Sequence, residues 1–157
     1  MKHIDSKPTF NLTQPIQFLA LGFGSGLAPK APGTFGTLAA IPVFLLLTML
    51  SPLLYGITVL VLALAGIYIC GKAADDVGVH DHPAIVWDEF VGFFITMFMV
   101  PVSWQSILVG FILFRIFDIL KPWPISFIDK KMTGGLGIMF DDVLAGFFAF
   151  AIMQLLF

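Results

Sequence analysis

The stretch "LLYGITVLVLALAGIYICG", residues 53–71, decides the fold class of this chain. It contains nineteen residues, and none of them is charged. A helix rises about 1.5 Å per residue, and the hydrocarbon core of a bilayer is about 30 Å thick, so about 20 apolar residues are needed to cross it. The stretch is therefore typical of a membrane-spanning helix rather than of a strand or a surface helix.

The composition of the whole chain supports this interpretation. Of the 157 residues, 59% are hydrophobic and only 11% are charged, whereas a soluble domain carries about 25% charged residues. So little charge cannot cover the surface of a globular protein in water, and we expect lipid to surround much of the chain. The net charge of -2 leaves no basic stripe for phosphates, so we expect no nucleic-acid partner.

Four further apolar stretches accompany the first one, and short breaks separate the members of two pairs. Ser51–Pro52 separates the first pair and Pro101–Ser103 separates the second, which predicts two helical hairpins followed by a single C-terminal helix. The predicted helices are Leu38–Leu50, Leu53–Gly71, Phe90–Val100, Trp104–Leu120 and Val143–Phe157. The sequence thus predicts an all-α fold, a small polytopic membrane bundle.

A short N-terminal region precedes this bundle. Residues 1–15 form a polar tail in which an acid and prolines break the pattern of a cleavable signal peptide. The apolar piece Ile16–Phe23 is too short to span a bilayer, and we expect an interfacial or re-entrant helix there. The length leaves no room for a second domain, so residues 1–157 are expected to form one membrane-embedded domain.

The positions of the charges predict the topology. After Lys7, the charged residues fall in or beside three regions: Lys30, Lys72–Glu89 and Arg115–Asp142. If each hairpin crosses the membrane and returns, all three regions reach the same face. Their lysines predict that this face is cytoplasmic, because cytoplasmic loops are enriched in Lys and Arg. The breaks within the hairpins and the C-terminal Phe157 would then lie at the opposite face.

Two adjacent acidic pairs stand where apolar stretches begin: Asp88–Glu89 and Asp141–Asp142. A single acid at a helix start commonly caps free N–H groups. Adjacent like charges, however, repel each other unless a cation lies between them, and a carboxylate close to hydrocarbon is costly. With Asp118 embedded in apolar sequence as well, these acids favour a metal site over capping. Carboxylate ligands without cysteines suit a hard ion such as Mg²⁺.

The segment "FRIFDILKPWPI", residues 114–125, adds two cations to the acids. Arg115, Asp118 and Lys121 are spaced by three, so on a helix they share one broad face. The arginine, by its fork, and the lysine, as a point charge, could hold a phosphate. Equally, both could pair with Asp118 while their charged ends reach the membrane surface. The residues by themselves leave these two interpretations about even.

A glycine- and proline-rich loop, "GFGSGLAPKAPGTFGT", lies at residues 22–37. Such a loop could present backbone N–H groups and Lys30 to an anion. By itself it is a weak signal, because glycine-proline loops are mostly turns. Together with the acids and the cations, it points to phosphate chemistry on a lipid headgroup.

Four segments of the chain resemble the signature segments of the phosphatidylglycerophosphatase A family, in the same order. They are "GSGLAPKAPGTFGT", "DHPAIVWDEFVG", "FRIFDILKPWPI" and "GGLGIMFDDVLAG", and the resemblance covers about residues 16–150. It implies a bacterial inner-membrane enzyme that hydrolyses phosphatidylglycerophosphate to phosphatidylglycerol and phosphate, using Mg²⁺, in the synthesis of anionic phospholipids. The expected partners are this lipid and the surrounding membrane lipids, and the sequence leaves the oligomeric state open.

The resemblance also suggests which residues form the site. Four acids are the expected metal ligands: Glu89, Asp141, Asp142 and Asp81. Two further acids are expected to orient water or the metal as catalytic residues: Asp88 and Asp118. The phosphate is expected to meet Arg115 and Lys121, which are also catalytic candidates, and Lys30 and Thr34 of the loop.

Asp81 corresponds to the acid that opens the family's second segment, although here the order is Asp81–His82–Pro83. His80 and His82 flank this acid and could coordinate a metal. As isolated surface histidines, we interpret them as bystanders.

Two interpretations of other classes remain open. Intramembrane carboxylates and interrupted helices also occur in ion or anion transporters, and "DEFVGFF" and "DDVLAGFF" echo each other. A transporter should carry acids at mid-helix depth, whereas most acids here lie at the ends of segments. A purely structural membrane protein, whose acids only cap helices, predicts that Asp141→Asn would leave activity intact, because Asn caps as well as Asp.

Overall fold

The computed structural model describes residues 9–157, and this part of the chain contains helices and no strands. The predicted all-α fold is thereby confirmed. Most of the expected polar tail falls on residues 1–8, outside the described part. In chain order the elements are α1 (Pro15–Ala20), the 3₁₀ turn η1 (Ser25–Leu27), α2 (Pro32–Leu47), α3 (Pro52–Val77), α4 (Trp87–Thr96), α5 (Trp104–Leu120), α6 (Ile125–Lys131) and α7 (Gly134–Leu156).

All five predicted bundle helices are present, but four of them begin earlier than expected, and the difference is largest for α2 and α7. Helix α2 begins at Pro32 instead of Leu38, because proline fits the first turn of a helix, where its missing N–H costs nothing. Helix α7 begins at Gly134 instead of Val143. The structure uses Gly134 and Gly135 in the first turn of this helix. The short helix α6 was not predicted.

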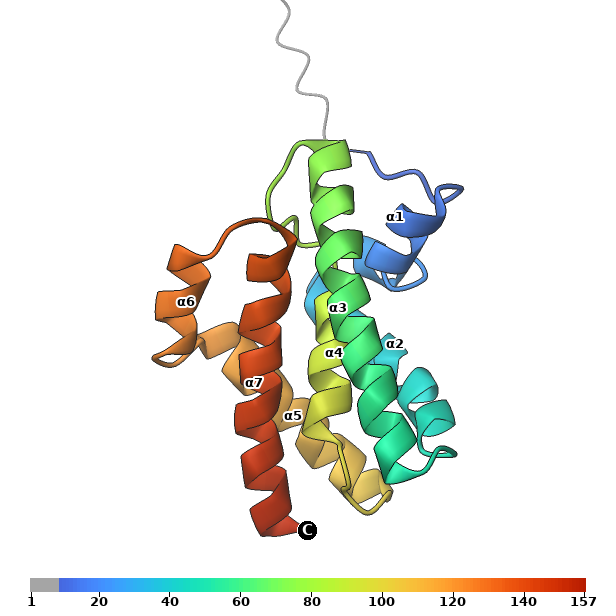
Figure 1. Ribbon diagram of the computed structural model, residues 1–157, viewed down its shortest axis with the longest axis vertical. Helices are drawn as coiled ribbons and strands as arrows, with labels where there is room; N and C mark the ends of the chain where they lie inside the picture. Colours follow the sequence, from blue (N-terminus) through green and yellow to red (C-terminus); the bar gives the residue numbers. More distant parts are fainter. Residues whose placement is uncertain (1–8) are drawn as a thin grey trace, which may run out of the picture.

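Helix α4 is the centre of the bundle although it is too short to cross a membrane. Its ten residues span about 15 Å, and all of them except Ile95 are buried. It lies between α3 and α7 (Figure 1), and α2 packs against it as well. Helix α1 is also short, as expected for Ile16–Phe23, and it packs against α3.

Two helices are long and apolar enough to cross a membrane, α3 with 26 residues and α7 with 23. In the most apolar stretch of α3, only 28% of the residues are buried inside the protein. The exposed side chains of this helix include Leu53, Leu60 and Leu64. A core helix of a soluble protein would bury such side chains, whereas a helix in a bilayer exposes them to lipid. The chain is therefore a small helical membrane protein.

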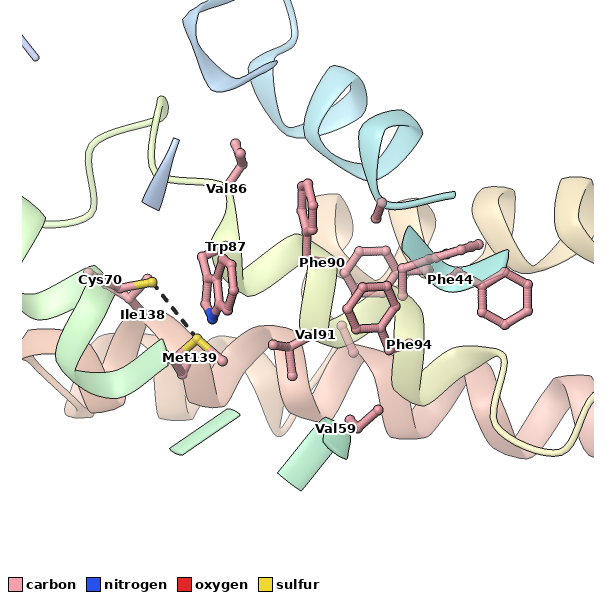
Figure 2. Packing of buried hydrophobic residues seen from close by; sticks show 14 of the residues in the cluster. Phe44, Val59, Cys70, Val86, Trp87, Phe90, Val91, Phe94, Ile138 and Met139 are labelled. Carbon is pink, nitrogen blue, oxygen red and sulfur yellow. Dashed lines mark hydrogen bonds between the residues drawn. The ribbon is translucent and has the colours of Figure 1, made fainter. Parts of the chain in front are cut away.

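Aromatic and sulfur-containing side chains fill the interior between α2, α3, α4 and α7 (Figure 2). Phe44 of α2 meets Phe93 of α4 edge-on, with ring centroids 5.6 Å apart. Cys70 of α3 lies with its Sγ 3.9 Å from the Sδ of Met139 on α7. Trp87, the first residue of α4, donates through Nε1 to a backbone carbonyl of α3 at 3.1 Å. These contacts hold α4 against α2 and α3, and α3 against α7.

Glycines allow α4 and α7 to approach each other closely. A Cβ atom at Gly146 would lie 2.7 Å from the backbone oxygen of Gly92. A Cβ atom at Gly92 would lie 2.9 Å from the backbone oxygen of Asp142 and would overlap the ring of Phe114. Neither distance occurs between real atoms of this kind, so this spacing of the two backbones requires glycine. It brings the acidic start of α4 next to Asp142.

Gly135→Ala is expected to destabilise the fold. A Cβ atom at this position would overlap the backbone oxygen of Ile67 on α3, and overpacking of this kind costs about 1–3 kcal/mol. Thermal unfolding of the purified protein in detergent measures the change. Gly56→Ala is the matched control, because its Cβ would lie 3.6 Å from the ring of Phe98, an ordinary contact. Equal unfolding midpoints for both variants would contradict the close packing of α3 on α7.

Candidate active site

The polar site lies where four helices meet, beside the middle of α3. The starts of α2 and α4, the end of α5 and the first half of α7 contribute to it. The α2–α3 and α4–α5 connections and the C-terminus lie together at one end of the molecule (Figure 1), and they carry no charged side chain. The charged segments thus lie away from this uncharged end of the molecule, as the topology prediction requires.

Three acids form a cluster in this site: Asp88 and Glu89 from the first turn of α4, and Asp142 from α7. One carboxylate oxygen of each lies within 4.8 Å of the others. The three residues are only 5%, 9% and 1% exposed, respectively. One oxygen of each (Oδ1 of Asp88, Oε2 of Glu89, Oδ2 of Asp142) has no hydrogen-bond partner within residues 9–157. Buried, unpartnered carboxylate oxygens at this spacing fit a divalent cation between them.

Helix capping does not explain Asp141 and Asp142. Because α7 begins at Gly134, Asp141 and Asp142 lie in its third turn, far from the free N–H groups of its first turn. The N-cap residue of α4, Val86, makes no side-chain capping hydrogen bond. The position of the α7 pair inside its helix therefore removes the reason to interpret it as a cap.

Asp141 pairs with a cation instead of joining the cluster. Its Oδ2 accepts a hydrogen bond from Nζ of Lys121 at 2.6 Å, and its Oδ1 accepts one from the backbone N–H of Asp142 at 3.0 Å. Lys121 also donates to Asp129 at 3.2 Å. Burial lowers the pKa of Lys121, but these hydrogen bonds and the two negative charges outweigh it, and the net shift of its pKa is upward. Lys121 is therefore protonated throughout the physiological pH range.

Arg115 of α5 lies beside the cluster. It forms an ion pair with Asp118, and its Nη1 lies 4.0 Å from Oε1 of Glu89. A Cβ atom at Gly33, in the first turn of α2, would lie 3.0 Å from both terminal guanidinium nitrogens. Nε of Arg115 has no hydrogen-bond partner in the described part of the chain. The start of α2 thus packs directly on the guanidinium group, next to the carboxylates.

The carboxylates that the structure brings together differ from the expected ligand set. Glu89 and Asp142, two of the expected ligands, are in the cluster, and Asp88 is its third member. Asp141 is engaged by Lys121 on one oxygen and by a backbone N–H on the other. Asp81 is exposed in the loop before α4, where its charged neighbours include Lys121. Asp141 and Asp81 thus lie outside the cluster of three acids, and their assignment as ligands stays a prediction.

The remaining expected residues belong to the end of α5, the start of α2 and the loop before α2. Arg115 and Asp118 lie near the end of α5, whereas Lys121 is the C-cap residue that follows this helix, so only the first two are on the helix as the spacing predicted. Thr34 lies in the first turn of α2, directly after Gly33. Lys30 is exposed in the loop that precedes this helix.

Two glycines of the site were missed by the sequence analysis. Gly33 and Gly92 carry no reactive group, yet each leaves space for a functional neighbour. A signal for Gly92 was present in the sequence, because an isolated glycine within an apolar helical pattern often marks a close approach of another element.

Comparisons with known proteins match nearly the whole chain. The family model described as Phosphatidylglycerophosphatase A matches residues 18–157. The chain is 48% identical over 147 residues to Phosphatidylglycerophosphatase A of Escherichia coli (strain K12), covering 92% of this chain and 86% of that protein. It is 52% identical over 141 residues to Phosphatidylglycerophosphatase A of Haemophilus influenzae (strain ATCC 51907 / DSM 11121 / KW20 / Rd), covering 88% of this chain and 86% of that protein.

A relative with a different name matches over a similar length. A protein of Bacteroides thetaiotaomicron (strain ATCC 29148), named Putative phosphatidylinositol-3-phosphatase, is 38% identical over 143 residues, covering 86% of this chain and 89% of that protein. A search of the solved structures finds no significant match.

Proposed function

The chain belongs to the phosphatidylglycerophosphatase A family, and we propose that it hydrolyses phosphatidylglycerophosphate at the cluster of Asp88, Glu89 and Asp142, with Mg²⁺ held by these three acids. The protein is a lipid phosphatase by its family. The observation that supports the proposed metal is the set of three buried carboxylate oxygens without a partner in residues 9–157. The product, phosphatidylglycerol, is an anionic phospholipid, so the proposed role is in the synthesis of anionic membrane lipids.

The proposed reaction breaks one phosphate ester bond. A water molecule attacks the terminal phosphorus, and the bond between this phosphorus and the glycerol oxygen breaks. The glycerol oxygen takes up a proton and becomes a hydroxyl group of phosphatidylglycerol, while inorganic phosphate is released. Bound Mg²⁺ would draw negative charge away from the phosphate oxygens.

Arg115 and Lys121 have different proposed roles in binding the phosphate. Arg115 would bind phosphate oxygens with its fork of N–H donors and stabilise the charge of the transition state. Its ion pair with Asp118 holds the guanidinium group in place. Lys121, which is protonated and fixed by Asp141, would attract the phosphate as a point charge.

Asp118 is the proposed group that orients the attacking water. Its negative charge acts on both Glu89 and Asp142, so it lies close to the cluster without belonging to it. A carboxylate at this position can accept a hydrogen bond from a water molecule that approaches the phosphate.

A transporter is less consistent with this geometry than an enzyme. Asp88 and Glu89 lie in the first turn of α4, a helix too short to cross a membrane, although Asp142 lies within the long helix α7. The relatives that match nearly the whole chain are named as phosphatases. We therefore place the chemistry at the membrane surface.

We further propose that the charged segments face the cytoplasm from the inner membrane of a bacterium. Reporter fusions in the α2–α3 connection, at Pro52, and after Phe157 should then both report the far side of the membrane. A third fusion in the loop before α4, after Gly78, should report the cytoplasm, because this loop lies away from the uncharged end. A cytoplasmic signal at Pro52 would refute this orientation.

Phosphate release by the purified protein in detergent tests the proposed function. The substrates are phosphatidylglycerophosphate, phosphatidic acid and phosphatidylinositol 3-phosphate, the last because one relative is named for it. We expect release to favour phosphatidylglycerophosphate. Preferred release from phosphatidylinositol 3-phosphate would change the substrate, and no release from any lipid by folded protein would reject the proposal.

A further inference from the structure

A cavity of about 530 Å³ lies beside the charged centre. Its volume is within the range of about 300–1,000 Å³ that is typical of small-molecule sites. It is formed by the N-terminal segment, the η1 region and the loop before α4, and not by the long apolar helices. Its lining residues include Phe10, Ala28, Pro29, Pro32, His82 and Pro83.

Two walls of this cavity continue directly into the charged centre. Pro32 precedes Gly33, where a Cβ atom would lie 3.0 Å from the guanidinium group of Arg115. His82 follows Asp81, and the charged neighbours of Asp81 include the lysine and a carboxylate at the end of α5. A ligand with its phosphate at the centre could therefore place its adjoining part in the cavity.

The chemistry of the lining excludes a second phosphate as the preferred ligand. Within residues 9–157, no lysine, arginine, aspartate or glutamate lines the cavity. Three of its lining residues are prolines, which have no N–H donor, so its backbone offers carbonyl acceptors in excess over N–H donors. Hydroxyl groups, which donate to carbonyls, match this wall better than anions do.

His82 supplies the side-chain donor that a hydroxyl oxygen needs. Its Nδ1 accepts a hydrogen bond from the backbone N–H of Ala84 at 3.0 Å. In the neutral ring the proton is then on Nε2, which is left as the donor. The ring of Phe10 meets the imidazole edge-on, with centroids 5.0 Å apart, and fixes its orientation.

We propose that this cavity binds the neutral polyol of the lipid headgroup and that His82 donates a hydrogen bond to it. In phosphatidylglycerophosphate this polyol is the glycerol between the two phosphates, which has one free hydroxyl. The inference rests on the proposed function and deepens it, because it names the residues that distinguish this headgroup from a phosphate attached directly to diacylglycerol.

Steady-state kinetics of two variants test this inference. His82→Ala removes the donor, and Ala28→Phe fills the cavity. For phosphatidylglycerophosphate we expect KM to rise about tenfold in each variant, the effect of one lost hydrogen bond of about 1.4 kcal/mol, with kcat within about twofold. For phosphatidic acid, which has no polyol, kcat/KM should not change. His80→Ala is the matched control, because His80 is exposed and does not line the cavity.

A second readout does not need turnover. Phosphatidylglycerol should raise the unfolding midpoint of the wild-type protein more than phosphatidylethanolamine does, because a bound ligand stabilises the folded state. Both cavity variants should lose this difference, and His80→Ala should keep it. An unchanged KM, an equal loss of activity on both lipids, or a retained phosphatidylglycerol effect would overturn the inference. If the wild type released no phosphate from any lipid, the proposed function would fail, and the unfolding shifts alone would decide the role of the cavity.

Discussion

Asp142→Asn should reduce the turnover of phosphatidylglycerophosphate by about 1,000-fold. The variant removes the negative charge of one of three carboxylates that face one another. A bound metal supplies several kcal/mol of transition-state stabilisation, and each 1.4 kcal/mol corresponds to a factor of ten in rate. Phosphate release measured at saturating lipid and Mg²⁺ gives the loss.

The same variant should remain folded. In the absence of metal, Asp142→Asn relieves repulsion between buried like charges, so its unfolding midpoint should equal or exceed that of the wild type. Asp75→Asn is the matched control, because Asp75 is exposed on α3, away from the cluster. Asp141→Asn should cost less activity than Asp142→Asn, because Asp141 acts through Lys121. Equal losses in these two variants of α7 would contradict the division of roles between them.

Arg115→Lys should lower kcat/KM by about 100-fold or more. Lysine keeps the positive charge but lacks the planar fork that holds two phosphate oxygens, and the loss of one preorganised donor commonly costs a factor of about 10²–10³. Arg115 is the only arginine of the chain, so no other residue can replace it. Kinetics over a range of lipid concentrations separate an effect on kcat from one on KM.

The control for this variant is Lys130→Ala. Lys130 is an exposed cation of α6, outside the site, so its removal tests whether a general loss of positive charge lowers activity. Full activity of Arg115→Lys would mean that only the charge matters and that the fork of donors has no part in the reaction.

Hydropathy alone predicted the all-α membrane bundle and its five main helices. In lipid, a long uncharged stretch must satisfy its backbone hydrogen bonds within itself, and a helix does so. Hydropathy did not predict where α7 begins. That boundary depends on Gly135, which packs on the backbone of Ile67, and a contact between residues so far apart in sequence leaves no local signal. The same holds for the cavity beside His82, which is built by three separate segments.

The sequence identified the acids of the site but not their partners. Neighbouring residues on a helix point about 100° apart, so only one acid of the pair Asp141–Asp142 can face α4. Which one does so depends on the rotation of α7, which the close packing of Gly92 and Gly146 fixes. Lys121 then forms an ion pair with the other acid, Asp141. None of these contacts follows from residue type or spacing.

The most direct test of the metal site is Mg²⁺ binding and phosphate release by protein that has been stripped with a chelator. The wild type should release no phosphate from phosphatidylglycerophosphate until Mg²⁺ is added back, and calorimetry should detect Mg²⁺ binding. Asp142→Asn should lose both responses, whereas Asp75→Asn should keep both. Full phosphate release by the wild type in the presence of excess chelator, or unchanged Mg²⁺ binding by Asp142→Asn, would contradict the assignment of the metal to Asp88, Glu89 and Asp142.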